Sequence, residues 1–328
     1  MHIGVNLNNR EALIAPNYGL PDLLDLAEQI EQLGFDSIWV GDSLLSKPRY
    51  EPLALLGALS QRTQRVRLGT ACLVTTLRHP VQLAQAWSTL DALAGGRTVM
   101  GACSGNIVED AVKREFAVVG IDYRERMPVF EEGPRIIRAL MTDGRVTFAG
   151  EHFLLFDVRF DTGTEPAPLL PVQRPPPIWV VSNPAIAASG AKPVSRAARR
   201  VAELGDGWMT CCRASHPEEV EGFLAELAGL RSVETFSVAY QVTVTLGATT
   251  DEALADQSRY ISAYYPGFHD AVALADWGPA GTADELTNWI RRFAAAGVNE
   301  FICRFASLDQ SGQVERFAGE VLPAVAES

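Results

Sequence analysis

Short apolar runs alternate with amphipathic segments along this chain, and this alternation is the feature that most constrains its fold. The runs are apolar at successive positions, as in strands buried on both faces, whereas the segments between them repeat with helical spacing. The runs predict strands at residues 3–7, 37–40, 66–74, 98–102, 178–181, 207–209, 237–246 and 299–304. Helices are predicted at residues 21–33, 52–61, 81–93, 195–204, 216–230, 250–263, 283–296 and 313–325.

This element order predicts an α/β fold, a TIM (β/α)8 barrel with insertions, as a single domain over residues 1–328. An open dinucleotide-binding sheet is disfavoured, because no G-x-G-x-x-G pattern follows the first strand. A small hairpin is predicted at residues 145–156. Loops at the carboxyl ends of barrel strands carry function, so long segments there are candidate lids. The insertions are expected near residues 104–125, 144–177 and 264–281.

Composition disfavours several classes of function. The formal net charge of −12 argues against a nucleic-acid-binding protein, and no apolar run approaches the about 20 residues of a membrane span. The five cysteines include no C-x-x-C pair, and the five histidines are scattered, so we expect no disulfide framework and no metal site. The first residues show no signal-peptide pattern. A cytoplasmic protein is therefore expected.

Three segments carry motifs that resemble a known family. They read GFDSIWVGD at 34–42, RLGTACLV at 67–74 with RHPV at 78–81, and LDALAGGRTVMGACSG at 90–105. In this order they resemble the bacterial luciferase-like superfamily of flavin-dependent monooxygenases and oxidoreductases, which has the predicted barrel fold. Weaker similarity continues through residues 174–183, 205–208 and 281–298.

The resemblance implies a redox enzyme with a flavin ring at the carboxyl mouth of the barrel. Our leading hypothesis is a monooxygenase in which reduced FMN, delivered by a separate flavin reductase, reacts with O2 and oxygenates a small organic substrate. One alternative is an enzyme of the same fold that uses the deazaflavin coenzyme F420 for hydride transfer. Another is a non-catalytic flavin-binding or partner subunit. Relatives also suggest a homodimer through the helix at 81–93, although core packing explains that helix equally well.

The resemblance also assigns residues to the cofactor. Small residues in the end part of the third strand are expected beneath the ring, with a non-proline cis peptide at Ala71–Cys72. A cysteine after the fourth strand is expected near the reactive edge of the ring. Polar residues after the fifth strand and at the next helix start are expected near the phosphate. The candidate cofactor contacts are Thr70, Ala71, Cys72, Cys103, Ser104, Asn106, Ser182, Asn183 and Ser195.

The catalytic acid or base is not identified by the sequence. Many relatives have a histidine after the acidic residue that follows the second strand, whereas here Ser43 follows Asp42. A serine hydroxyl cannot replace a group that titrates near neutral pH. The catalytic candidates are Cys103, Ser43 and His269. Arg304, at the end of the last strand, is predicted either to bind an anionic group or to form a surface salt bridge.

Overall fold

Eight parallel strands pair in a closed ring, because the last strand of the ring pairs with the first. The computed structural model describes residues 1–10, 18–105, 110–160, 169–183, 195–210, 216–264 and 277–326. The ring strands are β1 (His2–Leu7), β2 (Ser37–Val40), β3 (Arg67–Thr70), β5 (Thr98–Cys103), β8 (Ile178–Val181), β9 (Gly207–Thr210), β10 (Ser237–Leu246) and β12 (Glu300–Phe305). The predicted TIM barrel is confirmed.

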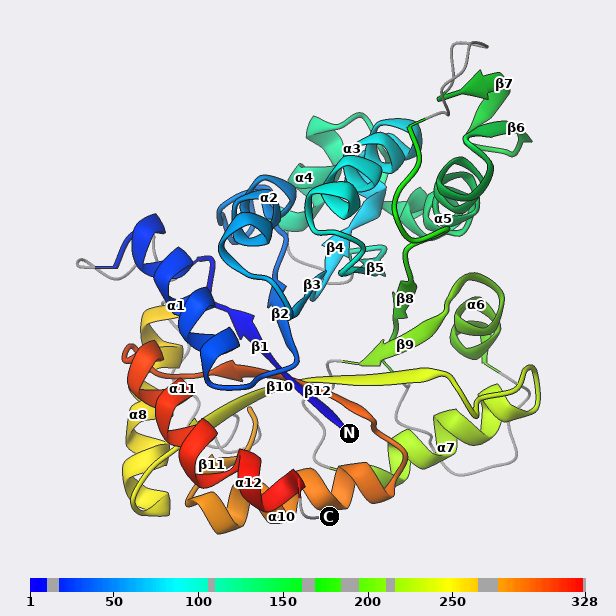
Figure 1. Ribbon diagram of the computed structural model, residues 1–328. Helices are drawn as coiled ribbons and strands as arrows, with labels where there is room; N and C mark the ends of the chain where they lie inside the picture. The colour runs from blue at the N-terminus through cyan, green and yellow to red at the C-terminus, as the bar shows by residue number, and fades with distance from the viewer. Residues whose placement is uncertain are drawn as a thin grey trace.

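Helices surround the ring (Figure 1). Those that follow the predicted pattern are α1 (Leu20–Gln32), α2 (Pro52–Arg62), α3 (Pro80–Leu93), α6 (Arg196–Leu204), α7 (Pro217–Ala228), α8 (Thr250–Tyr264), α10 (Ala283–Ala295), α11 (Gln310–Glu320) and α12 (Leu322–Ala326). The sequence did not predict α4 (Asp110–Val118) and α5 (Arg126–Asp143), although α5 is the helix that returns the chain from β5 towards β8. Pro134 lies inside α5 and interrupts its sequence pattern.

The predicted strand at 66–74 is divided in two. Between β3 and the short β4 (Leu73–Val74), the Ala71–Cys72 peptide bond is cis, as the resemblance implies. The two-residue β11 (Ala280–Gly281) pairs in parallel with the end of β10, and two single 3-10 turns lie at Thr75–Leu77 and Tyr123–Glu125. The predicted hairpin is confirmed as the antiparallel pair β6 (Arg145–Ala149) and β7 (Leu154–Arg159), which projects outside the barrel strands (Figure 1).

Large aromatic side chains close the barrel interior below its carboxyl mouth. The rings of Trp39 and Trp179 lie 5.1 Å apart, centroid to centroid, and both are buried. Glycine is required beside them, because a Cβ on Gly69 would stand 2.3 Å from the Trp39 ring. A Cβ on Gly101 would meet the Thr70 carbonyl oxygen at 2.1 Å. Trp39 and Trp179 thus belong to a packed interior cluster that reaches Ala71.

Helix α3 contributes Ala84 and Trp87 to the core of the same chain. Ala84 and Trp87 are fully buried, and the Trp87 Nε1–H donates to the Thr98 hydroxyl at 3.1 Å. Core packing thus accounts for these residues, and the homodimer stays a prediction. In the part of the chain that the structure describes, no helix has the length and apolarity needed to span a membrane.

Candidate active site

A cavity of about 740 Å³ opens at the carboxyl ends of the barrel strands. Residues from β1, β5, β8, β10 and β12 line it, together with the loops after β2 and β3. This volume lies within the usual range for cofactor and small-molecule sites, and this end of a TIM barrel is where active sites occur. The cavity is therefore the candidate active site.

The floor of the cavity is backbone with small side chains. Ala71 and Cys72, on either side of the cis peptide bond, both line it. The Gln241 side chain reaches across from β10 and donates from Nε2 to the Ala71 carbonyl at 3.2 Å. On β1, the Asn6 Oδ1 atom is buried and has no hydrogen-bond donor in the described part of the chain. The floor thus offers backbone and small side chains, and Asn6 adds a buried acceptor to the cavity lining.

Two thiols meet on this floor. The Cys72 thiol donates to the Cys103 sulfur, with the two Sγ atoms 3.0 Å apart. This hydrogen bond, followed by burial, raises the pKa of Cys72 well above its ordinary value. Since the thiolate is the nucleophilic form of cysteine, Cys72 is not suited to nucleophilic catalysis at neutral pH.

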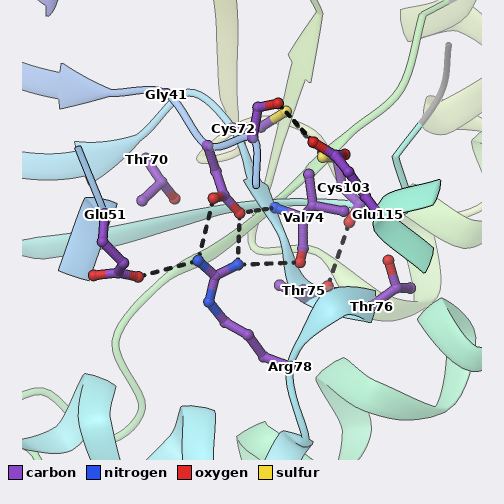
Figure 2. Close-up of polar contacts among 12 residues, drawn as sticks. Gly41, Glu51, Thr70, Cys72, Val74, Thr75, Thr76, Arg78, Cys103 and Glu115 are labelled. Carbon is purple, nitrogen blue, oxygen red and sulfur yellow. Dashed lines mark hydrogen bonds and ion pairs between the residues drawn. The ribbon is translucent and has the colours of Figure 1, made fainter. Parts of the chain in front are cut away.

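The acidic residue after β2 is held in an ion pair. Asp42 accepts from Arg78 with both carboxylate oxygens, at 2.6 and 3.1 Å, and from the Val74 N–H at 2.9 Å. Arg78 also donates to Glu51 (Figure 2). Burial opposes the charge of Arg78, but hydrogen bonds and charge, from Asp42 first and then Glu51, outweigh it and raise the pKa of the guanidinium. The pair fixes the loop after β2 against β4.

Ser43 leads to a residue that the sequence analysis missed. Its hydroxyl donates to Oε1 of Glu115 at 2.8 Å, and the same oxygen accepts from the N–H groups of Leu45 and Ser46, each at 2.6 Å. Glu115 lies on α4, is 3% exposed, and lines the cavity. A signal existed in the sequence, because Glu115 falls three residues after Val112 and therefore on the apolar face of its helix.

The structure separates the remaining predicted residues into three groups. Cys103, Ser104, Ser182, Asn183 and Arg304 line the cavity with Ala71 and Cys72. Thr70 and Ser195 do not line it. The Thr70 hydroxyl bonds to the backbone of Gly101, whereas the Ser195 hydroxyl caps α6 and donates to Glu226. Asn106 and His269 lie outside the described residues.

Comparison with known proteins places the chain in a family. A family described as luciferase-like monooxygenase matches residues 1–301. An F420-dependent glucose-6-phosphate dehydrogenase from Amycolatopsis mediterranei is 28% identical, over 94% of this chain and 96% of that protein. A protein of the same name from Beutenbergia cavernae is 29% identical, over 94% of each chain.

A solved structure adds a likeness of fold. The monooxygenase RslO1 from Streptomyces bottropensis has a TM-score of 0.80 at 22% identity, over 98% of this chain and 99% of that chain. Because the family match extends over most of the sequence and agrees with the motifs, the barrel and the position of the cavity, this chain belongs to the luciferase-like monooxygenase family.

Proposed function

We propose that this chain is an oxidoreductase in which the deazaflavin F420 would accept a hydride from a hydroxyl-bearing carbon of a small organic substrate, or return one to the corresponding carbonyl carbon. One observation carries the proposal. Three relatives, matched by sequence over more than nine tenths of both chains, are F420-dependent glucose-6-phosphate dehydrogenases by name. Our leading sequence hypothesis was an FMN monooxygenase, and these relatives favour its deazaflavin alternative.

The residues on the cavity floor fit a tricyclic ring of this kind. The backbone at Ala71–Cys72 would support its flat face. The ring carries an N–H group at its pyrimidine end, and the buried Asn6 Oδ1 is an acceptor of the type that such a group needs. Ser182 and Asn183, at the end of β8, stay the predicted contacts for the phosphate end.

A deazaflavin, when bound, exchanges a hydride with a substrate carbon and does not activate O2 readily. Oxidation of an alcohol carbon also releases the hydroxyl proton, so the chain must supply a group that accepts it. Two carboxylates occur among the described lining residues, Asp42 and Glu115. Both oxygens of Asp42 bond to Arg78, whereas the hydrogen bonds of Glu115 within the described residues use Oε1 alone. We propose that the Glu115 carboxylate accepts this proton and that Ser43 positions the carboxylate.

Cofactor titration tests this proposal. The purified protein is titrated with F420 and with FMN, each oxidised and reduced, and binding is followed by the visible absorption and fluorescence of each ring. We expect tight binding of F420, weak binding of FMN, and anaerobic bleaching of oxidised F420 when a hydroxyl-bearing substrate is added. Tight binding of reduced FMN with substrate-dependent O2 consumption would instead establish the monooxygenase hypothesis and remove this one.

A further inference from the structure

Three arginines from distant parts of the sequence converge on one buried tyrosine at the cavity wall. Tyr264, the last residue of α8, is 2% exposed. The guanidinium carbons of Arg304 and Arg10 lie 4.1 and 4.7 Å from the centre of its ring. The Arg49 Nη2 group donates to the Tyr264 hydroxyl at 2.8 Å. We call Arg10, Arg49 and Arg304 the arginine cluster.

Tyrosine, asparagine and backbone groups position the arginine cluster. Arg304 donates to the Tyr260 hydroxyl at 2.8 Å and to the Asn8 side-chain oxygen at 3.3 Å, and the ring of Tyr260 stacks on that of Tyr264. Arg49 also donates to the carbonyl of Lys47 at 3.3 Å. Aromatic faces and hydrogen-bond acceptors orient a guanidinium. These contacts therefore hold the guanidinium groups of Arg49 and Arg304 at defined places on the cavity wall.

The cavity lining has the opposite sign of charge to the chain as a whole. The chain carries a formal net charge of −12. Among the described lining residues, however, four are basic and two are acidic: Lys47, Arg49, Arg200, Arg304, Asp42 and Glu115. Arg78 balances Asp42 and Glu131 balances Arg200, and neither partner lines the cavity, so the remaining charged lining residues are Lys47, Arg49, Arg304 and Glu115. An acidic protein that gathers cations inside one cavity favours anions there.

We propose that the arginine cluster binds an oxyanion group, a carboxylate or a phosphate, of the organic substrate. The planar guanidinium fork matches both groups, and Arg49, Arg304 and Tyr264 all face the cavity. The inference rests on the proposed function, because it divides the cavity between a cofactor and a substrate. In the ring of strands, β1 stands four places from β8, so the cluster beside β1 and β12 lies across the mouth from Ser182 and Asn183.

Anion titration of the full-length, cofactor-free protein tests the proposal. Inorganic phosphate and malonate are the two probes, and binding is measured by isothermal calorimetry. The variants are Arg49→Gln, Arg304→Gln and the double variant. Arg259→Gln is the matched control, because Arg259 lies on α8 but is 72% exposed and pairs with Asp256. If Arg304→Gln fails to fold, Arg49→Gln is sufficient for the test, since Arg49 lies in a loop.

We expect at least one probe to bind the unaltered protein. Each single variant should weaken that binding about tenfold or more, while Arg259→Gln leaves it unchanged. Failure of both probes to bind, or equal affinity in all variants, overturns the proposal.

A parallel titration with F420 separates substrate from cofactor. Unchanged F420 affinity in the Gln variants supports a substrate site, whereas loss of F420 affinity assigns the cluster to the cofactor and overturns the proposal. If F420 does not bind the unaltered protein but the anion does, the proposed function fails and the anion site remains.

Discussion

Ser43 stands at the position where the family resemblance implies a histidine, and its hydroxyl contacts a residue of α4. Ser43 does not titrate near neutral pH, but it bonds to Glu115, which comes from a helix more than seventy residues further along the chain. The proton-handling group proposed here is therefore a carboxylate on α4. The sequence motif locates the position of the change, whereas only the fold identifies the partner.

Replacing Glu115 with glutamine tests this role. A glutamine side chain keeps a carbonyl oxygen for the donors from Ser43, Leu45 and Ser46, but it cannot accept a proton. We expect kcat for F420 reduction to fall about 100-fold or more, with F420 affinity unchanged. Full activity in Glu115→Gln would contradict the assignment. Ser43→Ala, which removes one of the three donors, should lower kcat less and shift its pH profile.

The Asp42–Arg78 pair makes a different prediction, about stability. Asp42→Asn removes the charge that balances Arg78, whose side chain is 22% exposed while that of Asp42 is 5% exposed. The variant leaves this largely buried guanidinium with Glu51, a half-exposed carboxylate, as its remaining described ion-pair partner, so the free energy of unfolding should fall by about 2 kcal/mol. Urea denaturation measures this change. Arg259→Gln, which breaks an exposed pair, should leave the midpoint unchanged; an equal effect of both variants would contradict the interpretation.

The sequence predicts the barrel strands better than it predicts helices α4 and α5. Barrel strands are apolar throughout because helices cover one face and the interior the other, so their runs are visible along the chain. The break between β3 and β4 was visible only through the family resemblance. Helix α5 was missed because Pro134 lies within it, and α4 because its buried face includes Glu115. A carboxylate on an apolar face weakens the periodic signal at the position where function is proposed.

A carboxylate also joins two elements of the barrel. Glu31 on α1 accepts from the N–H groups of Gln64, Arg65 and Val66, just before β3. Burial acts to raise the pKa of Glu31, but these three backbone hydrogen bonds outweigh it, so the pKa lies below its ordinary value of 4.5. The resulting stability is present above pH 4.5 and is lost as the pH falls through the lowered pKa.

Glu31→Gln should remove the contribution of Glu31 to the loss of stability at acidic pH. At neutral pH the variant is less stable than the unaltered protein by about 1–2 kcal/mol, and the two converge as the medium becomes acidic. Urea midpoints measured at a series of pH values check this prediction. Glu320→Gln, at a half-exposed carboxylate on α11, is the control. A stability difference that stays constant down to the most acidic pH would contradict the assignment.

Considered as a whole, the barrel separates two tasks between its ends. At the carboxyl mouth lie the cavity, the cis peptide bond, Glu115 and the arginine cluster. The sequence predicted the parts of this mouth that directly follow a strand, such as Ala71, Cys72 and Cys103. It missed Asn6, Gln241 and Arg49, because their positions depend on how the ring closes and how a loop folds. At the amino end, Arg67 at the start of β3 pairs with Glu300 at the start of β12.

This division of tasks predicts that stability and cofactor binding respond separately to mutation. Arg67 donates to both oxygens of Glu300, at 2.9 and 2.7 Å, across 233 positions of sequence, and the Glu300 side chain is 6% exposed. Glu300→Ala should lower the free energy of unfolding by about 3 kcal/mol, because it strands the guanidinium at the bottom of the barrel. F420 affinity measured on the folded variant should not change, since the pair stands at the opposite end of the strands from the cavity.

A double variant tests whether the two residues act as one unit. Arg67→Ala should lower the free energy of unfolding less when it is added to Glu300→Ala than when it is made alone. Additive losses, or loss of cofactor affinity in folded Glu300→Ala protein, would show that the two ends of this barrel are coupled.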